Sequence, residues 1–295
     1  MSSVNDAQVK QQVRQFYDQI GWKTVGEGVY QNAQYEDLRP VSREYIHLCH
    51  LRVGRHLAEQ GRLFLDAGSG PIQYPEYLEY SRGYQARVCS DISMVALQEA
   101  RQRIGDRGKG GHGLFVVADI AYLPFRADIF DGLISLHTIH HLPMDEHLTA
   151  YLELERVLIS QRTGVIVNGW DSSLVNRIFV APLKWVKRTR KRLRRFQTRF
   201  TTQQTQVKSM GLAKPQPKGT FVSKNNAQWL QREIGERMPI KILVWRSVSV
   251  RFLKAYVHAK LGGKYFLRLL YWLEERHAGF FGRYGQYPLI LIQKK

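Results

Sequence analysis

The 295 residues are 44% hydrophobic and 23% charged, a composition typical of a soluble globular protein that can bury a sizeable core. Only Cys49 and Cys89 are present, which excludes a disulfide framework or a zinc finger and favours a reducing, cytoplasmic setting. The first residues lack the apolar core of a secretory signal, and no apolar run approaches the roughly 18 residues that a membrane-spanning helix needs.

From residue 61 to residue 171, strand-like and helix-like stretches alternate along the chain. Short apolar runs predict five strands, at 62–67, 86–91, 113–119, 130–137 and 164–170. Helices are predicted between them, at 71–83 with Pro71 in the first turn, at 94–104 and at 145–158. Strands separated by helices indicate βαβ units with right-handed crossovers, so the expected fold class is α/β with a parallel sheet.

Three of the predicted strands end in an aspartate, namely Asp66, Asp91 and Asp119. Because ligands of such sheets bind beyond the carboxyl ends of the strands, the three carboxylates are expected along one rim. Gly68 and Gly70 follow Asp66 and allow a tight turn and a close approach of the backbone to a ligand at the N-terminus of the next helix. Each aspartate alone is more often a helix cap or a solvated strand end, so the prediction depends on their joint spacing.

This spacing predicts how an adenosine is held. Asp91, about 25 residues after Asp66, is placed to bind paired ribose hydroxyls. Asp119 can accept a hydrogen bond from the exocyclic amino group of adenine, and Ile92 and Met94 offer apolar surface to the ring.

Four stretches resemble the motifs of the class I S-adenosylmethionine-dependent methyltransferases, in particular the ubiquinone/menaquinone-type (methyltransferase type 11) subgroup. They are LDAGSG (65–70), CSDIS (89–93), VVADIAYLPF (116–125) and FDGLISLHTIHHL (130–142). The resemblance covers about residues 60–170 and implies a Rossmann-like, doubly wound seven-stranded sheet with an antiparallel last strand, and S-adenosyl-L-methionine as cofactor. The cofactor-binding residues that it implies are Asp66, Gly68, Ser69, Gly70, Asp91, Ile92, Met94, Asp119, Ile120 and His137.

The chain departs from the family's pattern at Ile72, where many relatives have a third glycine. The backbone there is expected to stand slightly further from the methionine portion of the cofactor. The departure leaves open a non-catalytic scaffold protein that keeps the fold and the cofactor but has lost methyl transfer.

Methyl transfer from a sulfonium is an in-line displacement that depends chiefly on positioning, and a base is needed only when the acceptor must lose a proton early. His137, His140 and His141 follow the fourth strand, beside the expected position of the methyl group, and are candidate general bases. The alternative is that they cap or pack the loop. No acid at ligand spacing supports a metal pair of His137 and His140, so no metal is expected.

Residues 1–60 are predicted to form an N-terminal helical lid segment on the core at 61–171. The stretch 13–37 is rich in aromatic residues and glycine, and in the resembling family such a segment often covers the cofactor. Phe16, Tyr17 and Tyr30 are the lid candidates, and packing of a helix on the sheet is an equal alternative. The residues expected to contact the acceptor are Tyr17 and Tyr30 of this segment, and Asn168 and Asp171 just past the fifth strand.

The positive charge is confined to the second half of the chain. Residues 1–171 carry a net charge of −4 and residues 172–295 one of +23. A helix at 225–237 and strands at 240–250 and 287–295 complete the expected core, so 172–224 and about 251–286 are predicted to be helical basic insertions. Apolar positions from Phe179 to Phe200 predict a basic amphipathic helix that begins near Pro182 and suits an anionic membrane surface. The alternatives are a helix packed on the domain with a solvated charged face, and charge that serves solubility alone.

These features favour a methyltransferase that acts on a small or lipophilic acceptor, in the cytoplasm or at a peripheral contact with an anionic membrane. A methyltransferase of RNA or another polyanion is the alternative, since the basic half could be an electrostatic footprint. Against it, the fourth strand reads SLHTIH and lacks the Asn/Asp-Pro-Pro-aromatic motif, and the catalytic Cys of the cytosine-C5 group is absent. Nucleic acid is therefore the less favoured partner. The acceptor, the methylated atom and the oligomeric state stay open.

Overall fold

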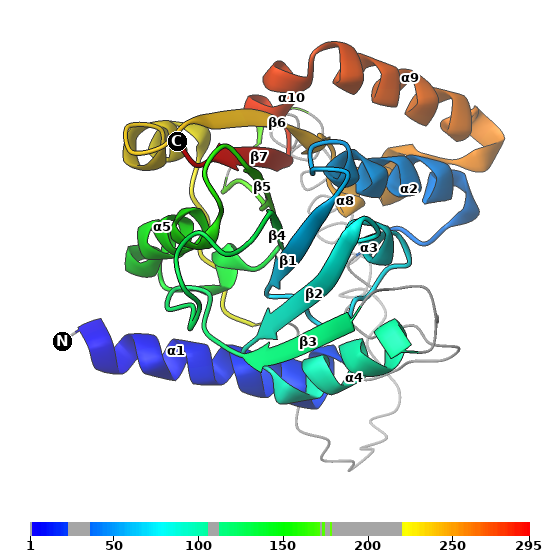
Figure 1. Cartoon of the computed structure of the whole chain (residues 1–295). Helices are drawn as coiled ribbons and strands as arrows, with labels where there is room; N and C mark the ends of the chain where they lie inside the picture. Colours follow the sequence, from blue (N-terminus) through cyan, green and yellow to red (C-terminus); the bar gives the residue numbers. More distant parts are fainter. Residues whose placement is uncertain (1, 23–35, 106–111, 172, 175–177, 179–219) are drawn as a thin grey trace, which may run out of the picture.

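The structure, a computed structural model, describes residues 2–22, 36–105, 112–171, 173–174, 178 and 220–295 (Figure 1). Seven strands form one sheet in the order β3-β2-β1-β4-β5-β7-β6. The strands are β1 (Gly61–Ala67), β2 (Tyr84–Asp91), β3 (His112–Val117), β4 (Gly132–Leu136), β5 (Thr163–Val167), β6 (Ile240–Arg246) and β7 (Tyr287–Gln293). The first five strands pair in parallel, whereas β7 is antiparallel to both β5 and β6. The predicted Rossmann-like, doubly wound seven-stranded sheet with an antiparallel last strand is confirmed.

Helices cover both faces of the sheet. The main ones are α1 (Ser2–Phe16), α2 (Pro40–Gly54), α4 (Met94–Gly105), α5 (His147–Val157), α8 (Val250–Tyr256), α9 (Gly263–Arg276) and α10 (Ala278–Tyr284). Shorter turns are the π-helices η1 (Tyr17–Gly21) and η5 (Leu230–Ile234), the α-helical turns α3 (Glu76–Glu79) and α7 (Ala227–Trp229), and the 3₁₀ turns η3 (Ile139–His141), η4 (Met144–Glu146) and η6 (Ala259–Leu261).

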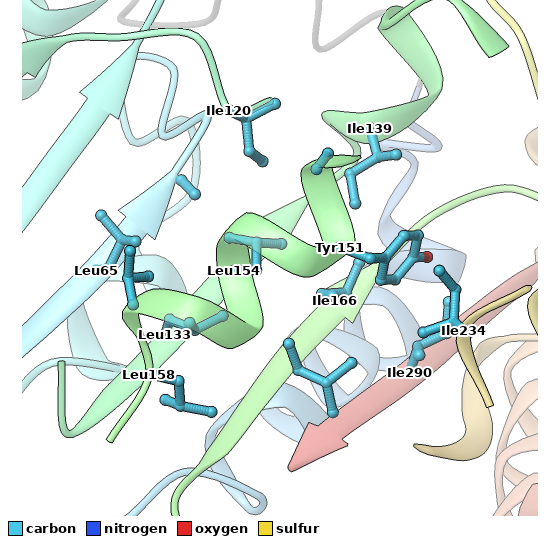
Figure 2. Close-up of a cluster of buried hydrophobic side chains, with 14 of the residues drawn as sticks. Leu65, Ile120, Leu133, Ile139, Tyr151, Leu154, Leu158, Ile166, Ile234 and Ile290 are labelled. Atoms are coloured by element: carbon cyan, nitrogen blue, oxygen red, sulfur yellow. The ribbon is translucent and has the colours of Figure 1, made fainter. Parts of the chain in front are cut away.

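The alternation of side chains along the strands gives the sheet two apolar faces. Leu65 and Leu133 lie in one cluster with Leu154 of α5 (Figure 2). Their chain neighbours Phe64 and Ile134 lie in a second cluster, which α2, α8 and α9 cover. Since both faces of the central strands are covered, these strands are mainly apolar, and the carboxyl edge of the sheet is where a polar site has access to solvent.

The N-terminal segment crosses that edge. In Figure 1, α1 runs past the carboxyl ends of β2 and β3. Lys10 of α1 donates to Asp119, just after β3, at 2.5 Å and to Glu146 at 2.6 Å, and Ser93 after β2 donates to Asp18 of η1. These charged contacts hold α1 and η1 over the region in which a ligand was expected.

The segment between β6 and β7 forms α8, α9 and α10, so this insertion is helical. Glu274 of α9 is fully buried, pairs with Arg52 of α2 at 2.8 Å and accepts a hydrogen bond from Tyr45 at 2.7 Å. The network fixes which face of α9 points outward. Within the described ranges, no helix is both long and apolar enough to cross a bilayer. The predicted basic helix near Pro182 lies outside the described residues, and so does Tyr30.

The prediction of a helix from Pro71 onward is wrong. Residues 71–75 form turns, and the four-residue α3 begins only at Glu76. Ile72 adopts a φ of 54°, which breaks a helical path, and Tyr74 precedes Pro75, which disfavours the α conformation at Tyr74. The glycine turn is therefore followed by irregular backbone instead of the first turn of a long helix.

Candidate functional site

A cavity of about 440 Å³ lies along the carboxyl edge of the sheet. Its size is within the range of about 300–1,000 Å³ that small-molecule sites occupy. The residues that line it include Val13, Phe16, Tyr17, Trp22, Glu36, Gly68, Ser69, Gly70, Pro71, Gln73, Tyr74, Tyr77, Asp91, Ile92, Leu136, His137, Thr138, His140, His141, Gly169, Thr220, Val222, Lys224, Arg246 and Tyr287. The cavity thus reaches from the tips of β1 and β2 to the ends of β5, β6 and β7.

The glycine turn forms one end of this cavity. Gly68 and Gly70 have φ values of 74° and 54°, in the left-handed region that favours glycine. A Cβ on Gly68 would lie 2.2 Å from Cγ2 of Thr138, and one on Gly70 would lie 3.2 Å from the ring of Trp22. Both glycines are therefore required by conformation and by the close approach of other residues.

Asp91 lies opposite the turn and is fixed by backbone donors. Its Oδ2 accepts from the Gly70 N–H at 2.9 Å and its Oδ1 from the Ser93 N–H at 2.8 Å. Burial raises the pKa of Asp91 to about 6, although the two backbone hydrogen bonds lower it. Each oxygen keeps a second lone pair, so the ionised carboxylate can still accept from ligand hydroxyls.

Ile72 keeps the backbone conformation that a glycine would adopt. Its φ of 54° is an outlier for a β-branched residue, and strained backbone of this kind costs about 1–3 kcal/mol. The side chain is 1% exposed and packs with Cys89, Leu97 and Ala100. Arg103 donates to its carbonyl oxygen at 3.0 Å. Packing and this hydrogen bond offset the strain, so the departure from glycine leaves the conformation of the turn intact.

Asp66 and Asp119 differ from the expected rim of three carboxylates. Asp66 is 2% exposed and pairs with the buried Arg87, so its charge is neutralised within the sheet and it does not line the cavity. Asp119 accepts from Lys10 and from the Ala121 N–H at 2.9 Å, and it too lies outside the cavity lining. Of the three aspartates, the structure brings only Asp91 to the cavity.

Of the other residues predicted to bind the cofactor, some line the cavity and some do not. Ser69 and Ile92 line the cavity beside Gly68, Gly70 and Asp91. Met94 is exposed at the start of α4, and Ile120 is buried in the apolar cluster under α5, so neither lines the cavity. Contacts of Met94 and Ile120 with the cofactor stay a prediction, since neither side chain belongs to the lining of this cavity.

The middle of the cavity holds His137, at the end of β4. Its backbone N–H donates to Val167 at 2.7 Å, and its φ of 59° is a second strained non-glycine conformation at the site. The ring lies edge-on to Trp245 and Tyr287, with centroids 4.9 and 5.7 Å away. Burial and then the Arg246 cation lower the pKa of His137 to about 3, so the imidazole is neutral at physiological pH.

His141 is held on both ring nitrogens. The Phe221 carbonyl oxygen can only accept, so Nδ1 of His141 carries the proton and donates to it at 2.8 Å. Nε2 must then accept, and the Tyr17 hydroxyl donates to it at 2.8 Å. Burial lowers the pKa of His141 to about 4. His141 therefore joins η1 to the segment at 221 and has no lone pair left for a substrate proton.

His140, unlike His141, is held on one ring nitrogen only. The Asn168 amide donates from Nδ2 to the Tyr151 hydroxyl, so its Oδ1 faces His140 and accepts from Nδ1 across a long contact of 3.4 Å. Within the residues that the structure describes, no donor reaches Nε2 of His140, so its lone pair is left as a base. Burial and the neighbouring imidazole of His141 hold the pKa of His140 well below its usual range. Of the three candidate bases, His140 has the clearest orienting partner and an available lone pair.

Sequence reasoning missed the far end of the cavity. Buried Arg246 at the end of β6 pairs with Glu36, and its guanidinium carbon lies 4.8 Å from the Tyr287 ring centroid. Lys224, just before α7, lines the same end. These residues come from four separate parts of the chain and form no motif. The only sequence signal was the cationic second half, which predicted anionic ligands without indicating a residue.

Asn168 and Asp171, two of the four residues predicted to contact the acceptor, differ in exposure. Asn168 is buried and orients His140, while Asp171 is exposed and its N–H donates to Asn225 at 3.1 Å. Phe16 and Tyr17 line the cavity beside Trp22, so the N-terminal segment covers it. In the part of the chain that the structure describes, no three His, Cys, Asp or Glu side chains are grouped to hold a metal ion.

Residues 65–166 match a family model described as a methyltransferase domain. No curated protein matches the sequence. Among solved structures, the chain is similar to a geranyl diphosphate methyltransferase in complex with GPP and sinefungin, with a TM-score of 0.57 and 12% identity over 98% of this chain and 100% of that chain.

Two further similar structures have comparable coverage. One is geranyl diphosphate C-methyltransferase from Streptomyces coelicolor A3(2), with a TM-score of 0.55 and 13% identity over 97% of this chain and 98% of the other. The second is the [4+2]-cyclase SpnF, with a TM-score of 0.52 and 17% identity over 97% of this chain and 96% of the other. At these identities the likeness concerns the fold. Residues 65–166 therefore match a methyltransferase domain, and the chain has the fold of the two geranyl diphosphate methyltransferase structures.

Proposed function

We propose that the protein is an S-adenosyl-L-methionine-dependent methyltransferase that acts on a small or lipophilic acceptor. The observation that carries this proposal is the continuity of the cavity. It joins the glycine turn and Asp91 to a compartment of neutral imidazoles and aromatic rings. A nucleoside cofactor and a second molecule could bind side by side in this cavity, where α1 and η1 cover both of them.

The residues at the β1 and β2 end fit the adenosine of this cofactor. Asp91 would accept from the ribose hydroxyls, and Gly68 and Gly70 would let the backbone lie against the ligand. When bound, S-adenosyl-L-methionine supplies an electrophilic methyl group. The chain's own contribution is then to exclude water with Phe16 and Trp22 and to hold the acceptor in line.

His140 is the proposed base for an acceptor that carries a proton. Its Nε2 would take the proton, while Asn168 holds Nδ1 and fixes the tautomer. Because burial keeps His140 neutral, the base form is present throughout the physiological pH range. An acceptor without a removable proton would use the same cavity and depend on positioning alone.

The chemistry of the lining supports a lipophilic acceptor. Tyr74, Tyr77, Leu136 and Val222 give the acceptor compartment aromatic and aliphatic walls. Two of the similar folds are named as methyltransferases of geranyl diphosphate, which has an apolar chain. A third is named as a [4+2]-cyclase, so the experiment must measure methyl transfer as well as binding.

The test has two stages. Calorimetry with S-adenosyl-L-homocysteine measures binding at the β1 and β2 end, and the absence of binding at millimolar concentration would reject the proposal. Transfer of labelled methyl groups into a lipid extract then measures activity. Binding without transfer into any lipid, small-molecule or RNA fraction would favour the non-catalytic scaffold, and transfer into RNA alone would favour the polyanion alternative.

The cellular setting that we propose is the cytoplasmic face of an anionic membrane, and α9 supports it. Tyr265, Leu269 and Trp272 are 74%, 56% and 59% exposed and recur at spacings of four and three, so they form one outward stripe. Lys264 and Arg268 lie beside the stripe and both pair with Glu44, so one positive charge of this group is left in excess. Exposed aromatic residues with adjacent cations suit the interface of an anionic bilayer. Figure 1 shows α9 on the periphery of the molecule, beside α2.

Sedimentation with vesicles tests this setting. We expect the protein to bind phosphatidylglycerol vesicles more strongly than phosphatidylcholine vesicles, and the double variant Leu269→Ser/Trp272→Ser to lose most of this binding. Leu114→Ser is the matched control, since Leu114 is exposed on β3, away from α9. Equal binding by the double variant and the control would exclude α9 as the membrane contact.

A further inference from the structure

We propose that the acceptor carries an anionic oxygen group, a carboxylate or a phosphate, which binds to Lys224 and Arg246 at the far end of the cavity. The inference rests on the proposed function and specifies its substrate class. It comes from the charges of this end, which neither the family match nor the sequence motifs describe.

Lys224 is a cation that lines the cavity, and the exposed Asp171, outside the lining, is the carboxylate that favours its charge. Its Nζ lies 3.1 Å from the position that a Cβ on Gly169 would take, next to the Tyr287 ring, and both neighbours line the cavity. Within the described residues, Lys224 forms no ion pair, and burial lowers its pKa. A partly desolvated ammonium gains most from an anionic partner, because removing it from water has already been unfavourable.

Arg246 adds a second cation at this end. The side chain is 2% exposed and lines the cavity, and Glu36 neutralises one side of its guanidinium. Its Nε is buried and has no hydrogen-bond partner among the described residues. Among the residues that line this end, the two cations Lys224 and Arg246 outnumber the single carboxylate Glu36, and Asp171 lies outside the lining.

The cofactor's own carboxylate is the alternative anion, and the sheet order argues against it. Lys224 lies beside Gly169, which follows β5, and beside Tyr287, which begins β7. The glycine turn follows β1, which β4 separates from β5. At about 4.8 Å between neighbouring strands, the two positions are about 10–14 Å apart along the edge. This separation from the glycine turn favours the acceptor, and the binding experiment below distinguishes it from the cofactor's carboxylate.

The walls between the two ends indicate what the anionic group is attached to. Tyr77, Leu136 and Val222 are apolar or aromatic and lie along the same cavity. An amphiphile with an anionic head and an apolar body would place its head at Lys224 and its body along these walls. Octanoate and octyl phosphate are simple probes of this class, and 1-octanol has the same chain without the charge.

Calorimetry on the full chain, saturated with S-adenosyl-L-homocysteine, tests the inference. We expect at least one of octanoate and octyl phosphate to bind more tightly than 1-octanol. The variant Lys224→Met should weaken the anion at least about tenfold and leave 1-octanol unchanged, whereas Lys224→Arg should retain most of the affinity. Lys241→Met is the matched control, because Lys241 is exposed on β6 outside the cavity.

Each outcome has one reading. Loss of octanoate binding alone identifies a carboxylate, and loss of octyl phosphate binding alone identifies a phosphate. Equal affinity for the anions and for 1-octanol, or no effect of Lys224→Met, overturns the inference while the proposed function stands. Weaker S-adenosyl-L-homocysteine binding by Lys224→Met, with an unchanged unfolding temperature, would assign the cation to the cofactor and also overturn it. No S-adenosyl-L-homocysteine binding by the unmodified protein rejects the proposed function itself.

Discussion

The two ends of the cavity are built differently. The end at β1 and β2 is made of backbone groups and one carboxylate, and Asp91 and Gly70, which bond to each other, are only 21 positions apart in the chain. The end at β6 and β7 is made of cations, imidazoles and aromatic rings, and the Glu36–Arg246 pair joins residues 210 positions apart. A local turn can hold a constant cofactor, whereas the acceptor end needs side chains from many elements.

The comparison also concerns charge. Asp91 gives the first end a negative charge when it is ionised, and Lys224 and Arg246 give the second end a positive one. Between them, His137 and His140 stay neutral because burial opposes their protonation. Variants at one end should therefore change cofactor binding and variants at the other should change turnover, which the following predictions test.

The largest effect is expected for His140→Ala. If His140 removes the acceptor's proton, the variant should lower kcat by about 10²–10⁴-fold and leave S-adenosyl-L-homocysteine affinity unchanged. Labelled-methyl transfer and calorimetry measure the two quantities. His112→Ala is the control, because His112 is exposed on β3. An unchanged kcat would show that positioning alone suffices.

Asp91→Asn should weaken cofactor binding at the β1 and β2 end of the cavity. The variant removes the charge and places an amide near the Gly70 and Ser93 N–H groups, so we expect S-adenosyl-L-homocysteine affinity to fall by about 10–100-fold. Asp131→Asn is a matched control, since Asp131 also accepts from two backbone N–H groups, those of Arg62 and Leu63. Asp131 does not line the cavity. Equal affinity losses in both variants would indicate a structural effect.

The pH dependence of cofactor binding sharpens the same comparison. Since the pKa of Asp91 is raised to about 6, its carboxylate protonates on acidification, and affinity should fall about tenfold between pH 7 and pH 5. The folded state binds this proton more tightly than the unfolded state, so Asp91 should make the protein more stable as the pH falls from about 6 towards 4. Calorimetry across this range measures the first effect. In Asp91→Asn the pH dependence should disappear.

Tyr17→Phe should have the smallest effect. It removes the hydrogen bond donated to Nε2 of His141, which joins η1 to the 3₁₀ turn η3. We expect the free energy of unfolding to fall by about 1 kcal/mol and cofactor affinity to fall only a few-fold, because the ring of Phe would still cover the cavity. Urea unfolding measures the first quantity. A loss of kcat without a loss of stability would instead give His141 a direct role.

The glycine turn, the place of Asp91 at a strand end and the parallel α/β sheet followed from the sequence, because each depends on short-range spacing and strand periodicity. The antiparallel last strand was implied by the family resemblance. The ion-pair partners of two of the three aspartates did not follow. Arg87 neutralises Asp66 within the sheet and Lys10 binds Asp119, and no local pattern predicts either partner. The helix expected at Pro71 also failed, since Ile72 adopts a left-handed conformation that its residue type disfavours.

Among the histidines, sequence spacing placed all three near the fourth strand but could not separate them. Their difference depends on Phe221, Tyr17 and Asn168, which saturate His141 and orient His140. Lys224 and Arg246 lay within a basic half in which no single cation stood out. Only the packing of β5, β6 and β7 showed which two face the cavity.

The sequence by itself determined the α/β fold and the cofactor turn, because hydrophobic periodicity and glycine conformation are local properties of the chain. The tertiary structure alone decided which carboxylates and imidazoles are free to act and which cations face the acceptor. Those properties depend on desolvation and on partners far apart in sequence, and both arise only when the sheet edge and its covering segments come together.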